Sequence, residues 1–160
     1  MAKIGEKLNK EFNDQVKEEL ESGYIYLAMS AWFAERTLNK LAAWFSKQAE
    51  EEFAHAMKFV NYILDSGGSI QYKELKEPKR DYANILEVLE ATYEHEKYIT
   101  GRIHHLYEIA QEEKEYSAYP ILHWFLDEQV EEEEQSAALI DKYKGYRNDF
   151  NFDHHVNREE

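Results

Sequence analysis

Glutamate and histidine residues occur in this sequence at spacings that suit a metal ion. Glu52 and His55 are three residues apart, so in a helix both side chains lie on one face and can reach the same ion. Gln129 and Glu132 repeat that spacing later in the chain. Oxygen donors with a single imidazole suit iron or manganese better than zinc. The indicated chemistry is therefore the binding and redox reaction of a divalent transition metal.

The overall charge agrees with cations as partners. The 160 residues carry 19 Lys+Arg against 33 Asp+Glu, a formal net charge of −14, which argues against binding the phosphate backbone of nucleic acid. The absence of cysteine excludes disulfides, thiolate metal sites and a cysteine nucleophile. No apolar run approaches the roughly 20 residues of a membrane span, and the N-terminus lacks the apolar core of a signal peptide. We therefore expect a cytoplasmic protein with neither nucleic acid nor membrane as a partner.

Four long helices and a short fifth one are predicted, because good helix formers fill the stretches between the few Gly and Pro residues. The predicted ranges are 6–36, 39–66, 82–111, 119–144 and 149–157. Pro120 suits the first turn of the fourth helix, and Asp81 is the predicted N-cap of the third. Gly67 and Gly145 stand where helix C-caps belong.

The joints between these helices differ in length, which predicts the topology. Short joints connect antiparallel neighbours, whereas 67–81 is long. A helix of about 28 residues measures about 42 Å, and fifteen extended residues reach about 50 Å. The third helix can therefore start at the far end, parallel to the second. The prediction is an all-α four-helix bundle with one long crossover between helices two and three. It is a single domain over 1–160, with the bundle over about 6–144 and a tail over 145–160.

Each predicted helix carries an apolar stripe with residues alternately three and four apart, as bundle helices do. Polar residues interrupt every stripe near the middle of its helix. In antiparallel pairs with short joints, positions equally far from the turn lie at the same depth. The residues predicted to converge in this way are Glu19, Glu52, His55, Glu96, Gln129 and Glu132.

Four carboxylates in one buried layer require cations. Each buried charge costs several kcal/mol even after relaxation, and neighbouring like charges raise one another's pKa. Two divalent ions would balance four negative charges. Glutamates from two helices, combined with Glu-x-x-His pairs from others, are the arrangement of di-iron carboxylate bundles.

Four segments make this pattern more specific: 19–32, 49–55 (AEEEFAH), 93–96 (YEHE) and 124–133 (WFLDEQVEEE). With them the sequence resembles the bacterial non-haem ferritins over about 6–145, nearly the whole chain. The resemblance implies an iron-storage protein with ferroxidase activity. Such a protein oxidises Fe²⁺ with O₂ or H₂O₂ and stores ferric mineral inside a shell of twenty-four subunits.

The resemblance also implies roles for individual residues. Glu19, Glu52 and His55 would hold one iron, and Glu52 would bridge to a second. Glu96 and Glu132 would hold that second iron, with Gln129 beside it. Tyr26 matches the tyrosine near the di-iron centre. A third iron site, facing the cavity of the shell, maps to Glu51, Glu128 and Glu131.

Departures from related patterns separate the alternatives. Helix four carries Gln129-x-x-Glu132 rather than a second Glu-x-x-His, unlike bacterioferritins and rubrerythrins. Phe53 stands where bacterioferritins have a haem-ligating methionine, so we expect no haem. Two other functions remain open: a rubrerythrin-like di-iron enzyme that reduces peroxide or O₂, and an acidic helical interaction module without metal. The segment after Gly145 is short and polar compared with the fifth helix that lines channels in the family.

Overall fold

The structure is a computed structural model that describes residues 3–158. Its elements are α1 (Glu6–Ala34), α2 (Asn39–Asp65), α3 (Ile85–Glu112), the 3₁₀ turn η1 (Tyr116–Ala118), α4 (Tyr119–Lys144) and α5 (Asp149–His154). The described part of the chain contains no strand. The predicted all-α class, with four long helices and a short fifth, is confirmed. No helix within residues 3–158 has the length and apolar character needed to cross a bilayer.

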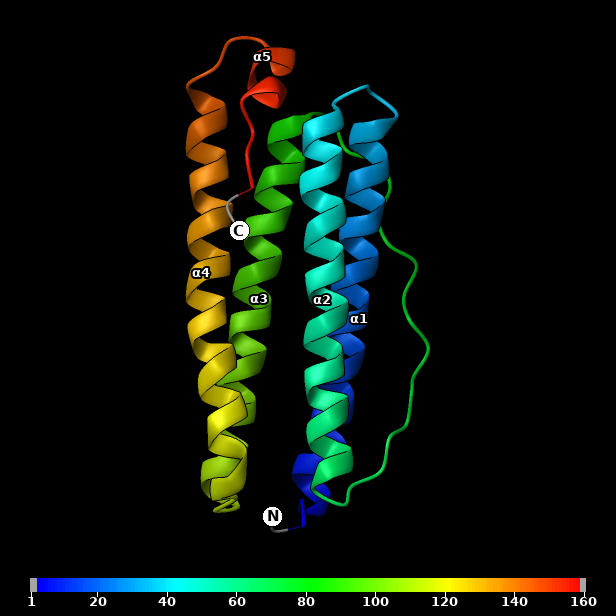
Figure 1. The fold of residues 1–160 in the computed structure, drawn as a ribbon, viewed down its shortest axis with the longest axis vertical. Coiled ribbons are helices and arrows are strands. Elements are labelled where there is room, and N and C mark those ends of the chain that lie inside the picture. The colour runs from blue at the N-terminus through cyan, green and yellow to red at the C-terminus, as the bar shows by residue number, and fades with distance from the viewer. Residues whose placement is uncertain (1–2, 159–160) are drawn as a thin grey trace.

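Two helical hairpins form the bundle (Figure 1). Short turns join α1 to α2 and α3 to α4, so the members of each pair are antiparallel. The connector over 66–84 contains no helix and runs along the side of the bundle, returning the chain to the end where α2 began. Because of this return, α2 and α3 are parallel, which confirms the predicted crossover.

The third helix begins later than predicted, and Asp81 is not its N-cap. Asn84 takes that position with extended backbone, and its side chain accepts a hydrogen bond from the backbone N–H of Glu87 (2.9 Å). Asn caps as well as Asp, and the Glu87 carboxylate accepts in return from the backbone N–H of Ala83, as in a capping box. The extended segment also lets Tyr82 pack edge-on against Trp32. The helix start is therefore set by this reciprocal pairing.

The second helix ends with a glycine in the left-handed region. Gly67 has φ +73°, a conformation that costs other residues energy. The N–H of Gly68 bonds to Ile63 O (2.8 Å) and that of Gly67 to Leu64 O (3.1 Å), the Schellman pattern. Gly145 also follows its helix, but with φ −81° it uses no glycine-specific conformation.

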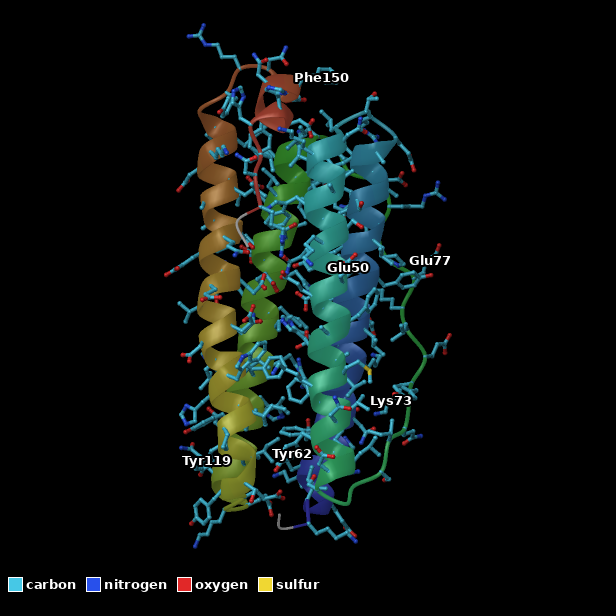
Figure 2. All side chains as sticks on the ribbon, viewed as in Figure 1. Glu50, Tyr62, Lys73, Glu77, Tyr119 and Phe150 are labelled. Carbon is cyan, nitrogen blue, oxygen red and sulfur yellow. The ribbon has the colours of Figure 1, made fainter. Side chains whose placement is uncertain are left out.

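Two apolar clusters fill the bundle on either side of a polar middle. One is built around Phe12, Phe59 and Phe125, and the other around Tyr26, Phe33 and Phe45. Side chains occupy the space between the hairpins along the whole bundle (Figure 2). The interrupted stripes are therefore the true inward faces, and the polar residues between the clusters lie at mid-depth.

The C-terminal segment folds back onto the bundle. α5 lies across the end of the bundle (Figure 1), with Phe152 fully buried while Phe150 remains exposed (Figure 2). Asp153 Oδ1 accepts a hydrogen bond from the backbone N–H of Leu41 (2.8 Å). After α5, which ends at His154 rather than 157, the chain turns back along the bundle. The tail is thus packed against the helices and does not extend away from them.

Candidate metal centre

Carboxylates from all four long helices, with one imidazole, meet at mid-bundle. Three overlapping groups have ligand atoms within 4.8 Å of one another. The groups are Glu19–Glu52–His55, Glu52–Glu96–Glu132 and His55–Glu128–Glu132. Glu52 belongs to two of the groups, so one carboxylate can contact two ions. All of these side chains are buried except Glu128, which is half-buried.

Amide side chains hold several of these carboxylates in place. Gln48 Nε2 donates to Glu52 Oε1 (3.0 Å) and to Glu132 Oε2 (2.8 Å). On α1, which pairs with α2 in the same hairpin, Gln15 Nε2 donates to Glu19 Oε1 (3.0 Å). His55 Nδ1 lies 3.2 Å from Glu52 Oε2 and 3.9 Å from Glu19 Oε2. Glu19 therefore has one oxygen fixed by an amide and the other near His55, and one oxygen of Glu132 is likewise fixed by an amide.

Glu96 lacks any such partner. Both of its carboxylate oxygens, and the hydroxyl of Tyr26, are buried without a hydrogen bond to any described residue. Buried polar atoms are almost always paired in native proteins, because an unpaired one costs free energy. A divalent cation bound to Glu52, Glu96 and Glu132 would satisfy the Glu96 oxygens. The donor set and its unpaired atoms therefore fit metal ions.

The carboxylates of this layer have shifted pKa values because they are buried close to one another. Burial and the charge of Glu52 raise the pKa of Glu19 and of Glu96 well above the usual range. The same two causes raise the pKa of Glu132 to about 8. Burial would raise the pKa of Glu52 as well. The hydrogen bond and charge of His55 outweigh burial and hold the pKa of Glu52 below its usual value. One carboxylate thus stays charged, while its neighbours retain protons until a cation replaces them.

Two further residues predicted for this centre, Gln129 and Tyr26, lie beside its carboxylates. Gln129 is buried, and its Nε2 donates to Glu96 O and to Thr100 Oγ1, both at 3.1 Å. It therefore ties α4 to α3 beside the carboxylates. Tyr26 is fully buried, and burial raises its pKa well above the usual range, so its hydroxyl stays protonated.

The residues predicted for a third site line one cavity, and among the described residues only Glu128 of the three belongs to a group with ligand atoms within 4.8 Å of one another. Glu51, Glu128 and Glu131 border a cavity of about 730 Å³ on the face between α2 and α4. Glu51 Oε2 is paired with Arg158 (2.6 Å), Glu128 Oε1 lies 3.9 Å from His55 Nε2, and Glu131 is exposed. Glu128 therefore lies nearest the central layer, whereas Glu51 is engaged elsewhere.

Sequence reasoning missed the residues that orient the carboxylates. Gln15 and Gln48 each precede a layer glutamate by four residues, Glu19 and Glu52 respectively, which places donor and acceptor on one helix face. This repeated Gln-x-x-x-Glu spacing was a usable signal. Arg158 gave no signal, because its contact with Gln48 joins positions 110 residues apart.

A bundle with one long crossover and a buried carboxylate layer supplied by all four helices defines the ferritin-like class of helical proteins. A family model described as the ferritin-like domain matches residues 9–145. The chain belongs to this family.

Similar proteins with names and structures agree with this assignment. The bacterial non-heme ferritin of Campylobacter jejuni is 34% identical over 141 residues, covering 88% of this chain and 84% of that protein. A probable bacterial non-heme ferritin-like protein of Haemophilus influenzae is 37% identical over 139 residues, covering 87% and 84%. The open-pore ferritin of the archaeon Archaeoglobus fulgidus superposes with a TM-score of 0.90 at 36% identity, covering 93% and 91% of the two chains.

Proposed function

We propose that this protein stores iron and has ferroxidase activity. In this proposal it binds Fe²⁺ at the central layer, oxidises it with O₂ or H₂O₂, and keeps the ferric product inside a 24-subunit shell. The observation that carries the proposal is the sharing of Glu52 between two buried ligand groups. Membership of the ferritin-like family and the names of its relatives support the same function.

The proposed substrate positions follow from the ligand groups. One Fe²⁺ would contact Glu19, Glu52 and His55, and a second would contact Glu52, Glu96 and Glu132. Two Fe²⁺ balance the four carboxylates of this layer, which removes the repulsion between them. The iron substrate supplies the electrons that O₂ accepts. Gln15 and Gln48 orient the ligands, and Gln129 and Tyr26 border the site.

A third, weaker iron position is proposed at Glu51, Glu128 and Glu131. These residues line a common cavity beside the central layer, and Glu128 lies near His55. An ion there would require Glu51 to leave its arginine partner. The position would therefore fill after the central pair.

The rubrerythrin-like alternative has less support. Its second iron domain needs cysteine pairs, and this sequence has none. The helix-four motif has glutamine rather than glutamate at Gln129, and the relatives carry ferritin names. An acidic helical module without metal gives no account of the two unpaired oxygens of Glu96.

Replacement of Glu52 tests the proposal. Glu52→Ala should lose rapid Fe²⁺ oxidation, followed by stopped-flow absorbance in air, while circular dichroism still reports a folded bundle. Glu50→Ala is the matched control, because Glu50 is exposed and forms a surface salt bridge with Lys47. Wild-type rates in Glu52→Ala would contradict the assignment. Light scattering should give about 460 kDa, twenty-four times the 19.1 kDa of one chain.

A further inference from the structure

The C-terminal tail reaches the candidate metal centre through Arg158. Its Nη2 donates to Gln48 Oε1 (2.7 Å) and to Glu51 Oε2 (2.6 Å), and its Nη1 donates to Trp44 O (3.2 Å). The guanidinium also lies 4.5 Å from the centroid of the Trp44 ring. Only 14% of this side chain is exposed. Three hydrogen-bond acceptors and the face of an aromatic ring therefore fix the position of this guanidinium.

The contact with Gln48 determines how that amide is oriented. An amide has one accepting end and one donating end. Because Arg158 donates to Oε1, Nε2 must face the centre, where it donates to Glu52 and Glu132. Reversing the amide would place its nitrogen against the guanidinium and its oxygen against two carboxylates. Arg158 therefore fixes two proposed ligands through a single intermediary.

The neighbouring helix α1 carries the same arrangement, with its arginine supplied by α3. Arg102 Nε donates to Gln15 Oε1 (3.1 Å), and Gln15 Nε2 donates to Glu19 (3.0 Å). Arg102 belongs to α3, so this pair is fixed within the bundle. Two independent Arg–Gln–Glu relays converge on one layer. The tail supplies the arginine for Gln48, just as α3 supplies the arginine for Gln15.

Several contacts hold the tail in the position from which Arg158 acts. Phe152 and Val156 are buried. Lys40 Nζ donates to His154 O (2.7 Å), and Lys142 Nζ donates to His155 O (2.5 Å), so the tail is tied to both α2 and α4. Arg158 is thereby placed at the cavity bordered by Glu51, Glu128 and Glu131.

Arg158 has a second effect, on Glu51. Its positive charge occupies the carboxylate that a third cation would need, so such a cation must displace the guanidinium. The two effects oppose each other: one supports ligands of the central layer, and the other blocks a ligand of the outer position. A merely structural tail contact would not produce this pair of opposite effects.

We propose that Arg158 is a positioning residue of the metal centre, one that strengthens cation binding at the central layer and weakens it at Glu51. This inference rests on the proposed function, since it requires that the layer bind metal. It assigns to the C-terminal tail a direct part in ordering the sites, so that the central pair fills before the outer position.

Anaerobic calorimetric titration of the full chain with Fe²⁺ tests the proposal, with Co²⁺ absorption as a spectroscopic readout of ligand geometry. Arg158→Ala should lower the affinity for the first two ions about tenfold or more, as is usual when a group that orients metal ligands is removed. It should also alter the Co²⁺ absorption spectrum. In the later phase of the titration, which reports binding at the outer position, it should raise the affinity. Arg158→Lys keeps the positive charge but loses the planar guanidinium. It should therefore lower the affinity for the two central ions and leave the affinity of the later phase as in wild type.

Two comparisons isolate the relay. Arg147→Ala removes a positive charge at an exposed position shortly before α5 and should leave the binding of the first two ions and of the later ion unchanged. In a Gln48→Ala background, Arg158→Ala should no longer affect the first two ions, yet should still tighten the later phase. If Arg158→Ala and Arg147→Ala bind both sets of ions alike, the proposal is overturned while metal binding stands. If the wild-type chain binds no ion, the proposed function is overturned together with this inference.

Discussion

Asp153 caps a helix that begins 114 positions earlier in the chain: its Oδ1 accepts a hydrogen bond from the backbone N–H of Leu41 at 2.8 Å. Leu41 lies in the first turn of α2, where backbone N–H groups have no partner within the helix. The N-cap position of α2 is Leu38, which has no side-chain acceptor. The tail therefore supplies a cap that the local sequence lacks.

Removing this cap should destabilise the whole bundle. We expect Asp153→Ala to lower the free energy of unfolding by about 1 kcal/mol, the usual cost of losing an N-cap. Asp153→Asn should retain most of the stability, because the amide oxygen can still accept. Urea denaturation measures both changes. The control is Asp141→Ala, at an exposed position, where a change within about 0.5 kcal/mol is expected. Equal losses in the two alanine variants would exclude the capping role.

Metal should stabilise the protein more at pH 7 than at pH 5. Raised pKa values mean that folded apo protein holds protons on Glu19, Glu96 and Glu132 that the unfolded chain has lost. The stability contributed by these protonated groups is complete below about pH 4.5. It is lost as the pH rises toward the folded value, about 8 for Glu132. A bound cation replaces those protons and restores stability by mass action.

Anaerobic melting of apo and Fe²⁺-loaded protein at both pH values measures this effect. The increase in Tm on adding Fe²⁺ should be larger at pH 7. An equal or larger increase at pH 5 would show that these carboxylates are not the groups that bind the ion.

A neutral replacement of Glu96 should stabilise the apo protein at high pH. Folding at pH 7 must either protonate Glu96 or bury its charge, and Glu96→Gln avoids both costs. Its advantage should grow with pH by up to about 1.4 kcal/mol per unit above the pKa of the unfolded chain, and should be small at pH 5. The same variant should lose part of the stabilisation by metal. Glu94→Gln, at an exposed position, is the control and should show no such pH trend. If Glu96→Gln changed the free energy of unfolding equally at every pH, Glu96 would not be a buried carboxyl with a raised pKa.

The outer position should affect iron stoichiometry more than the initial rate. Glu128→Ala combined with Glu131→Ala should lower the number of ions bound per subunit, with the fast oxidation phase largely kept. Anaerobic titration and stopped-flow absorbance measure the two quantities. Glu134→Ala removes an exposed charge from the same helix and serves as the control. An unchanged stoichiometry in the double variant would rule out a third position at these residues.

The layer was predictable because it depends on periodicity. Burial of a helix stripe follows from residue spacing, and short joints fix the depth at which two stripes meet. Residue spacing alone therefore predicts that Glu19, Glu52 and Glu96 lie at one depth in the bundle. The amides that orient these carboxylates were not predicted, although Gln15 and Gln48 each precede a layer glutamate by four residues.

Two features could not be predicted from residue spacing: the choice between equivalent cap residues and the path of the tail. Asp81 and Asn84 are both good cap residues, and the choice was decided by the Glu87 pairing and the packing of Tyr82. Arg158 belongs to a tail whose path over the bundle has no local signal. The pairing of Glu51, one of the carboxylates predicted for the outer site, with Arg158 depends on that path as well.

The long connector over 66–84 has a consequence for how the chain comes apart. It leaves the protein as two hairpins, each closed by a short turn and rich in local contacts, a topology that favours fast folding of each hairpin. Glu19, Glu52 and His55 lie on one hairpin, whereas Glu96 and Glu132 lie on the other. Ions held between them would act as a reversible cross-link that closes the connector into a loop. Hairpin separation would then have to wait for metal release, so iron would prolong the lifetime of the folded subunit as well as increase its equilibrium stability.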